Sequence, residues 1–329
     1  MASSVAIIGA GISGLTCGLR LRQAGYSVVL FEKSRGVGGR VAQRRAPQNI
    51  EFDHGAQYFT VQDPRFESVV ASWQEQRLVD SWDGLIGTLR RGQWQRSTGD
   101  TVRYVGTPAM TSIAKHLAQD LQVLLQTKVG QVQFNAERRQ WQLLNELGRP
   151  LGTFDAVVVS TPAAQAVQLL PNWQLLQAAV GRVVMAPCWT VLLAYEESLG
   201  FPLDGAFVQD SPLSWIARNN SKPRRSALPE CWVLHGSPSW SRENIEMPSD
   251  EVVRALRAAF WEAAARPLQS AQYTFVHRWR YALPVETLPE RFLFDPDQGL
   301  AACGDWCGGP RVEGAYLSGL ELAEAMLSA

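Results

Sequence analysis

The sequence predicts an α/β fold, in which a parallel sheet covered by helices is joined to an inserted α+β part built on an antiparallel sheet. The first observation is a pair of short apolar runs, 4–9 and 27–31, which flank a helical pattern at 12–24. This strand–helix–strand order implies parallel strands. The second is a series of strand-like runs separated by turn residues over 122–160, as in an antiparallel meander. The third is that 163–290 is richer in Trp and Pro and again contains strand-like runs.

Local signals place the individual elements in chain order. In the first helix, Ile12, Leu15, Leu19 and Leu21 form an apolar stripe, and Gly25 ends the helix. Further helices are expected at 64–79, 110–121 and 250–265. Strands of the antiparallel part are expected at 189–195, 205–209, 231–235 and 272–282. A glycine-rich loop followed by a helix is expected over 300–329.

Length and charge narrow the class of protein. A chain of 329 residues has room for one large domain or two interlocked domains. It carries 31 Lys and Arg against 31 Asp and Glu, so its charge does not suggest a nucleic-acid partner. The basic stretch 222–225 is expected to be a solvated loop. No apolar run is long enough to span a bilayer, and the first strand begins too early for a signal peptide, which predicts a cytoplasmic protein.

The cysteine and histidine content predicts no metal site. The five cysteines include no Cys-x-x-Cys pair, and the chain has only four histidines. A structural zinc site or a redox-active disulfide would need such a pair or a histidine cluster. We therefore expect buried, reduced thiols and no bound metal.

A glycine motif follows the first strand. Gly9, Gly11 and Gly14 form G-x-G-x-x-G between a strand and a helix, where a dinucleotide diphosphate can approach the helix N-terminus. Glu32 ends the second strand, and an acid at that position can accept hydrogen bonds from ribose hydroxyls. Its charge would repel a 2′-phosphate, which disfavours NADP at this position. The motif therefore predicts bound FAD or NAD.

A second glycine-rich stretch favours FAD. The segment from Arg35 to Arg40 contains Gly36, Gly38 and Gly39, and it resembles the R-x-x-G-G-R signature of the flavin amine oxidase superfamily. The resemblance implies that these glycines and Arg40 lie along the FAD diphosphate. Glycine amides and a guanidinium are suitable donors to phosphate oxygens.

Two further segments resemble the same superfamily. The stretch 52–59 resembles the segment that passes the flavin ring, and 302–306 with 312–319 resembles the Gly-Asp motif and the helix after it. The resemblance implies that Asp305 and Ala315 contact the ribityl and pyrimidine parts of FAD, where a helix N-terminus would stabilise reduced flavin. It assigns to noncovalent FAD the residues Gly9, Gly11, Ile12, Ser13, Gly14, Glu32, Lys33, Gly38, Gly39, Arg40, Gly55, Ala56, Gln57, Val129, Thr161, Gly304, Asp305, Gly314 and Ala315.

Within the superfamily, the chain is similar to the renalase-like group. The similarity rests on 53–60, 235–242, 277–282, 303–307 and 312–315. It implies a glutathione-reductase-like FAD fold of amine oxidase topology. It also implies the oxidation of dihydronicotinamides, especially misreduced 2- and 6-dihydro or α-anomeric NAD(P)H. In that reaction a hydride passes to flavin N5 and O2 reoxidises the flavin to give H2O2.

An alternating aromatic run marks a candidate substrate wall. Five aromatic residues share one face of the expected strand, while Arg278 and Arg280 lie on the other: Tyr273, Phe275, His277, Trp279 and Tyr281. That face could wall a flat substrate, or it could simply pack on a core. His235 could likewise meet the substrate or be a satisfied histidine within a sheet. We predict that Tyr58, His235 and Trp279 line the substrate pocket.

Two alternative functions stay open on the sequence. A flavin amine or polyamine oxidase would need a lysine near flavin N5, and Lys222 is the only candidate because Lys33, Lys115 and Lys128 lie elsewhere. The other alternative is a flavin-binding sensor without turnover. No cysteine occurs in 265–295, which argues against covalent flavin by the usual monoamine oxidase route.

The motif positions also predict how the chain divides. The flavin domain is expected to be discontinuous and to comprise 1–65, 105–162 and 292–329. The substrate domain is expected to comprise 66–104 and 163–291.

Overall fold

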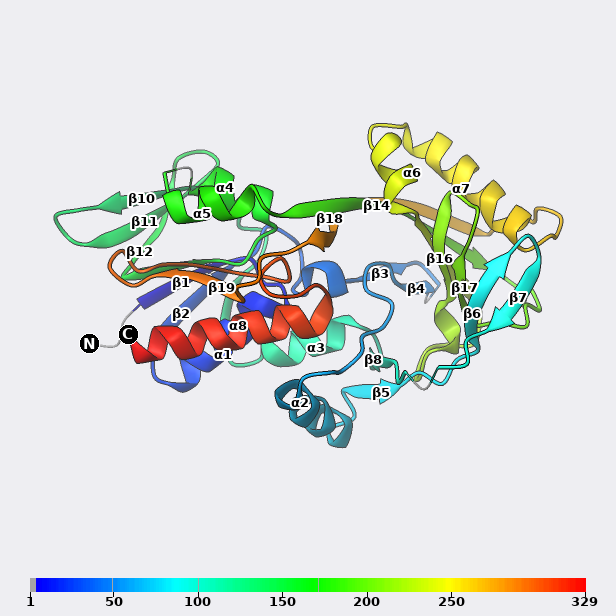
Figure 1. Ribbon diagram of the computed structural model, residues 1–329, viewed down its shortest axis with the longest axis horizontal. Coiled ribbons are helices and arrows are strands. Elements are labelled where there is room, and N and C mark those ends of the chain that lie inside the picture. Colours follow the sequence, from blue (N-terminus) through cyan, green and yellow to red (C-terminus); the bar gives the residue numbers. More distant parts are fainter. Residues whose placement is uncertain (1–3, 49, 100, 171) are drawn as a thin grey trace.

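The computed structural model describes residues 4–48, 50–99, 101–170 and 172–329. The molecule is elongated, with a six-stranded sheet toward one end and a seven-stranded sheet toward the other (Figure 1). The long strands β14 (Val184–Tyr195) and β18 (Tyr273–Glu286) run between the two ends. Among the described residues, none of the helices combines the length and apolar character needed to cross a membrane.

The six-stranded sheet has the order β19-β20-β13-β1-β2-β9, and all its neighbouring pairs are parallel except β19–β20. Its strands are β1 (Ser4–Ile8), β2 (Ser27–Phe31), β9 (Gln122–Leu124), β13 (Ala156–Val159), β19 (Phe292–Asp295) and β20 (Leu300–Cys303). With α1 (Ile12–Gln23), the first two strands form the expected parallel βαβ unit. The α/β fold class is therefore confirmed.

Alternating apolar residues cover both faces of this sheet. Ile7 belongs to the cluster formed with α1, α2 (Pro64–Glu75), α3 (Thr111–Leu117) and α8 (Arg311–Ser328). Ala6 and Ile8 belong to the opposite cluster, which includes the meander and two short helices. These elements are β10 (Val129–Asn135), β11 (Gln140–Asn145), β12 (Pro150–Phe154), α4 (Ala163–Leu169) and α5 (Gln174–Val180).

The seven-stranded sheet has the order β18-β14-β17-β16-β15-β6-β7. Besides β14 and β18, it contains β6 (Ile86–Arg90), β7 (Gln93–Arg96), β15 (Gly205–Val208), β16 (Leu213–Arg218) and β17 (Glu230–Gly236). All pairs are antiparallel except β15–β6, so the expected antiparallel sheet is largely confirmed. Helices α6 (Pro238–Glu243) and α7 (Ser249–Ala263) lie over one face (Figure 1).

Short elements lie between the two large sheets. The hairpin of β3 (Gln43–Ala46) and β4 (Ile50–Asp53) occupies the centre of the view (Figure 1). The others are η1 (Gly39–Val41), β5 (Val79–Ser81), β8 (Tyr104–Gly106) and η2 (Asn219–Ser221). The helix expected at 64–79 ends earlier, at Glu75, because Arg77 has a left-handed φ of 59°. The helix expected at 110–121 ends at Leu117.

Three helices pack across the expected division of the chain. Helix α2 shares a cluster with α8, and α4 and α5 share a cluster with the six-stranded sheet. Sequence reasoning had placed 66–104 and 163–291 in the substrate domain. The cluster that contains α2 also includes Ile86, Trp215 and Ala217 of the seven-stranded sheet, so the expected division of the chain stays a prediction.

Candidate active site

The first glycine loop contains two glycines that the fold requires and one that it does not. Gly9 has a φ of +107°, and a Cβ on Gly14 would lie 2.3 Å from the Gly9 carbonyl oxygen. Gly11 is extended, with φ −79° and ψ 177°, and a Cβ there would meet no atom of the described residues within 4 Å. Ile12 and Ser13 begin α1, and within the described part of the chain no side chain caps that helix start. The loop therefore leaves open space in front of an uncapped helix N-terminus, as a diphosphate requires.

The second glycine stretch lies against the first. The Gly38 N–H donates to the Ala10 carbonyl at 2.8 Å. Gly38 and Gly39 have φ values of 111° and 54°, and a Cβ on Gly39 would lie 3.8 Å from the Gly11 Cα. Two loops that the sequence singled out separately thus border the same space.

Glu32 is placed as the motif predicts, at the end of β2. Its carboxylate accepts from the Ala10 N–H at 3.0 Å and from the Ser34 N–H at 2.8 Å. Lys33 beside it is exposed, and Val129 is buried at the start of β10. The Thr161 hydroxyl, after β13, is buried and has no hydrogen-bond partner among the described residues. Together with the space at Gly11, this orphaned hydroxyl and the uncapped helix start fit a bound dinucleotide.

An ion pair that the sequence did not reveal joins two of the motifs. Both terminal nitrogens of Arg40 donate to the Asp305 carboxylate, at 2.8 Å and 2.6 Å, and Arg40 also donates to the Ala282 carbonyl at 3.2 Å. The Gly304 N–H donates to the Ser318 hydroxyl at 2.9 Å. The expected contacts of Arg40 with the diphosphate and of Asp305 with the ribityl chain stay predictions.

The closing helix begins earlier than expected. Helix α8 starts at Arg311, so Gly314 and Ala315 are its fourth and fifth residues rather than its first. A Cβ on Gly314 would lie 1.9 Å from the Gly309 carbonyl oxygen, which explains the glycine by close packing. Their expected contact with the flavin stays a prediction.

The segment Asp53–Gln57, here called the ring segment, packs against the Arg40 backbone. The Ala56 N–H donates to the Arg40 carbonyl at 2.9 Å. A Cβ on Gly55 would lie 2.0 Å from that carbonyl oxygen and 3.4 Å from Trp279 Cζ2. The Gln57 amide donates to the carbonyls of Asp53 and Gly55. The ring segment is thus held between the second glycine stretch and the aromatic strand β18.

Next to the ring segment lies a buried charge cluster, which corrects one expectation. The stretch 222–225 was expected to be solvated, yet the side chain of Lys222 is 0% exposed and that of Arg225 is 3% exposed. Both contact the buried carboxylate of Asp53. Burial lowers the pKa of Lys222 to about 8, against the opposing effect of Asp53. Burial raises the pKa of the Asp53 carboxyl group. Lys222 and Arg225 together lower that pKa by more, so the net shift is downward.

The face of the seven-stranded sheet opposite α7 forms an aromatic wall. Register pairs place Trp215, His235, Thr190 and His277 side by side on four neighbouring strands, and directly paired residues share a face. Arg278 and Arg280 lie on the face of β18 that points away from the wall, as expected. Both pair there with Glu246.

The chain segment 54–58 faces this wall. The His54 ring lies 5.1 Å from His277 and 5.0 Å from Trp279, and Tyr58 lies 5.6 Å from Trp215. Trp279 also donates from Nε1 to the His54 carbonyl at 3.2 Å. Tyr58, His235 and Trp279 therefore lie on or against one wall. Three residues of this region were not among the predicted site residues, namely His54, Thr190 and Trp215, although His54 lies inside the segment 52–59.

Three of the four histidines of the chain meet at this wall and are neutral at pH 7. Burial and then the charge of His277 lower the pKa of His54 to about 4. Burial and then Lys222 lower the pKa of His235 to about 4, although the His54 carbonyl opposes the shift. Burial and then Arg44 lower the pKa of His277.

These pKa values predict acid destabilisation. Between the ordinary pKa of about 6.5 and about 4, His54 and His235 bind protons in the unfolded state but not in the folded one. The free energy of unfolding should therefore fall as the pH drops from about 7.5 to about 4.5, by roughly 2 kcal/mol or more. Urea unfolding at the two pH values measures this. A His235→Asn variant should show a smaller pH dependence, and an equal one would contradict the assignment.

No group of three or more His, Cys, Asp or Glu within the described ranges could hold a metal ion.

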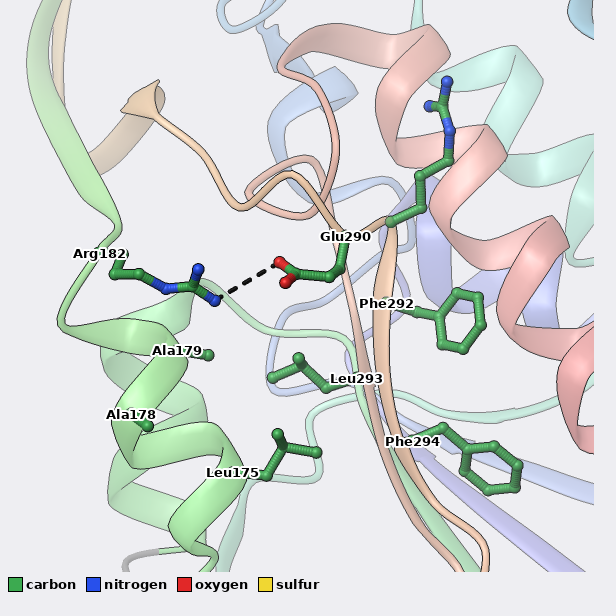
Figure 2. A pocket seen from close by; sticks show the side chains of 9 residues that line it. Leu175, Ala178, Ala179, Arg182, Glu290, Phe292, Leu293 and Phe294 are labelled. Carbon is green, nitrogen blue, oxygen red and sulfur yellow. Dashed lines mark hydrogen bonds and ion pairs between the residues drawn. The ribbon is translucent and has the colours of Figure 1, made fainter.

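A surface hollow of about 590 Å³ lies between α5 and the segment 290–294, where Leu175 and Leu293 approach each other (Figure 2). Arg182 and Glu290 form an ion pair at 3.5 Å across it. It contains none of the predicted site residues.

Comparison with known families gives two matches. Residues 7–73 match the NAD(P)-binding Rossmann-like domain, and residues 91–327 match the flavin containing amine oxidoreductase family. Among curated proteins, 4,4′-diaponeurosporene oxygenase of Staphylococcus aureus is 34% identical over 61 residues, which is 18% of this chain and 12% of that protein. This match thus spans only a small part of the relative.

Solved structures share the fold over the whole chain. A protein of Exiguobacterium sp. 255-15, provisionally assigned as a protoporphyrinogen oxidase, superposes with a TM-score of 0.79 at 13% identity, covering 100% of both chains. Putrescine oxidase with bound putrescine gives 0.75 at 14% identity, again over 100% of both chains. Cyclohexylamine oxidase of Brevibacterium oxydans gives 0.75 at 13%, over 100% of this chain and 99% of that one. At such low identity these likenesses show the fold alone.

Proposed function

The chain belongs to the flavin containing amine oxidoreductase family and is an FAD-dependent oxidoreductase, and from this premise we propose that it oxidises dihydronicotinamides. The proposed substrates are misreduced 2- and 6-dihydro or α-anomeric forms of NAD(P)H. O2 is the proposed electron acceptor, with H2O2 as product, and FAD is proposed to bind noncovalently. The cytoplasmic location expected from the sequence stays a prediction.

One observation carries the proposal: the side chains that form the wall facing the ring segment are aromatic or neutral. Trp279, Trp215 and Tyr58 offer flat apolar surfaces, and the histidines beside them are neutral. Hydride transfer between two flat rings requires stacking and exclusion of water more than proton transfer. A wall of this composition suits a dihydronicotinamide ring.

Each residue of the site is assigned a role in binding FAD or the substrate. FAD, when bound, supplies the hydride acceptor. Trp279 and Tyr58 orient the substrate ring and exclude water. His235 Nε2 is buried and has no hydrogen-bond partner among the described residues, so it can bond a substrate amide. The loops around Gly11 and Gly39 hold the diphosphate, and Glu32 holds the adenosine ribose.

Amine oxidation is the second candidate function. The observation that favours it is the burial of Lys222 beside Gln57 in the ring segment, since the amine oxidase alternative needed a lysine close to the flavin. Putrescine oxidase and cyclohexylamine oxidase also share the fold. The sensor alternative is set aside, because the family is one of oxidoreductases.

Anaerobic stopped-flow absorbance of the flavin distinguishes the two functions. The purified holoenzyme is mixed separately with 6-dihydro-NAD, with ordinary β-NADH and with a panel of amines. We expect rapid bleaching by the 6-dihydro isomer and none by amines. Bleaching by an amine alone would overturn the proposal in favour of amine oxidation, and no bleaching by any of them would reject both substrate classes.

Replacing Trp279 with Ala should slow flavin reduction and raise KM while FAD stays bound. Removal of the indole takes away the stacking surface next to His54 and His277, at ring distances of 5.0 Å and 4.2 Å. We expect a loss of about 10- to 100-fold in the reduction rate at low substrate. The control is Trp94→Ala on β7, outside the wall. Unchanged reduction kinetics in Trp279→Ala would remove Trp279 from the site.

A further inference from the structure

A buried ion-pair cluster joins the ring segment to the turn that follows β16. Asp53 ends β4, whereas Lys222 and Arg225 follow η2, which comes directly after β16. Lys222 Nζ lies 3.2 Å from Asp53 Oδ2, and an Arg225 terminal nitrogen lies 2.8 Å from the same oxygen. We call these three residues the Asp53 clamp. All three side chains are at least 97% buried, so water does not screen them.

All three protons of the Lys222 ammonium have acceptors within the protein. Besides Asp53 Oδ2 at 3.2 Å, Nζ donates to Gln57 Oε1 at 3.2 Å and to Asn219 Oδ1 at 3.3 Å. An ammonium has three donors and no acceptor. Lys222 therefore has no free donor for a ligand or for a bridging water while these bonds hold.

The acceptors of Lys222 are themselves fixed to the backbone of the ring segment and its neighbours. The Gln57 amide donates to the carbonyls of Asp53 and Gly55, and Asn219 donates to the Glu51 carbonyl at 3.0 Å. The Asn219 carbonyl oxygen also accepts from the Asp53 N–H at 3.2 Å. Through these bonds, Lys222 determines where the Gln57 side chain and the ring-segment backbone lie.

The other side of the clamp reaches the start of α3. Asp53 Oδ1 accepts from the Met110 N–H at 2.9 Å, and Arg225 donates to the Gly106 carbonyl at 2.9 Å. One carboxylate thus holds two cations and a backbone N–H at once. Loss of either cation would leave buried polar groups of several segments without partners, so the geometry of the ring segment depends on the whole clamp.

We propose that Lys222 is a positioning residue, which holds Gln57 and the ring segment in the conformation that would bind FAD and does not exchange protons with substrate or flavin. This inference goes beyond the proposed substrate. It rests on the contacts of Lys222 within the Asp53 clamp and not on the identity of the substrate, so a failure of the dihydronicotinamide proposal would not affect it. It does imply that Lys222 is not the lysine that amine oxidation would need beside flavin N5.

The test compares Lys222→Met with Lys128→Met in the holoenzyme. Lys128 is exposed and pairs with Glu146 on the surface, so it is a control for the same substitution. The measurements are the Kd for FAD, the flavin absorption spectrum, and the pH profile of flavin reduction. We expect Lys222→Met to weaken FAD binding at least about tenfold and to change the spectrum, because the ring segment loses its fixed position. The pH profile of the flavin that remains bound should match that of the wild type, and Lys128→Met should change nothing.

A second variant keeps the proposal falsifiable if Lys222→Met does not fold. Gln57→Leu retains the ion pairs of the Asp53 clamp but removes the amide that Lys222 holds. We expect it to fold and to show the same change of the flavin spectrum, whereas a wild-type spectrum in this variant would overturn the proposal. A Lys222→Met enzyme with wild-type FAD affinity and spectrum would also overturn it. If Lys222→Met kept wild-type FAD binding but its rate of flavin reduction no longer changed with pH near pH 8, Lys222 would exchange a proton in the reaction instead.

Discussion

A Gly11→Ala variant is expected to fold at least as stably as the wild type yet to bind FAD about 100-fold more weakly. Gly11 has an ordinary extended backbone, and an added Cβ would lie more than 4 Å from every atom that the structure describes outside its chain neighbours. Alanine is therefore tolerated by the fold, and the unfolded chain loses some freedom, which stabilises by up to about 1 kcal/mol. The added methyl group would instead occupy the space next to Gly39 where the diphosphate is predicted to lie. A 100-fold loss corresponds to roughly 3 kcal/mol.

Gly14→Ala is the matched control, because the same substitution three residues later should have the opposite effect. A Cβ there would lie 2.3 Å from the Gly9 carbonyl oxygen and 3.0 Å from Ser160 Cβ. We expect a loss of about 2–3 kcal/mol in the free energy of unfolding even without FAD. Denaturant unfolding of both apoproteins and titration with FAD separate the two effects. If Gly11→Ala bound FAD normally, the diphosphate would not lie at this loop.

The second large effect is expected for Asp53→Asn, which should lower the free energy of unfolding by about 3–5 kcal/mol. The amide keeps the shape of the side chain but removes the charge that lies 3.2 Å from Lys222 and 2.8 Å from Arg225. Two cations would then remain buried without a compensating carboxylate. Thermal or denaturant unfolding near pH 7 measures the loss of free energy. A change below about 1 kcal/mol would show that other groups compensate the charges of Lys222 and Arg225.

Asp63→Asn is the control for the removal of a carboxylate charge. Asp63 pairs with Arg65 at 2.8 Å, but the Arg65 side chain is 47% exposed and the Asp63 side chain 20%. Asn is also a good helix N-cap, which is the position of Asp63 before α2. We therefore expect a change within about 1 kcal/mol. The two aspartates differ in burial, so the comparison isolates the effect of desolvation.

Much of the flavin half could be predicted because its signals are local in the sequence. The apolar runs 4–9 and 27–31, with the helix between them, appear in the structure as a parallel βαβ unit. Glu32 directly follows the second strand, which ends at Phe31, as the motif requires. Residue spacing within about thirty positions determines this arrangement, because strand alternation, helix periodicity and glycine freedom act through neighbouring residues.

The substrate half was predicted less completely. The alternation of aromatic residues and arginines on β18 was correct, since Arg278 and Arg280 lie on the outer face. Alternation identifies the two faces of one strand, but it does not identify the strands beside it or their register. For that reason His235 and Trp279 were found as single candidates, whereas Thr190 and Trp215 beside them were not.

By itself, the sequence determined the α/β class, the glycine loops and the acid that follows them. Only the tertiary structure decided that the side chains of Lys222 and Arg225 in the basic stretch are buried, and that Lys222 lies against Asp53, 169 positions earlier in the chain. The same holds for Arg40 and Asp305, which are 265 positions apart. An isolated lysine or arginine is most favourable in water, and it becomes buried only where distant segments bring a carboxylate and carbonyl groups to it. Such partners are chosen by the packing of the whole chain, so no local pattern could have named them.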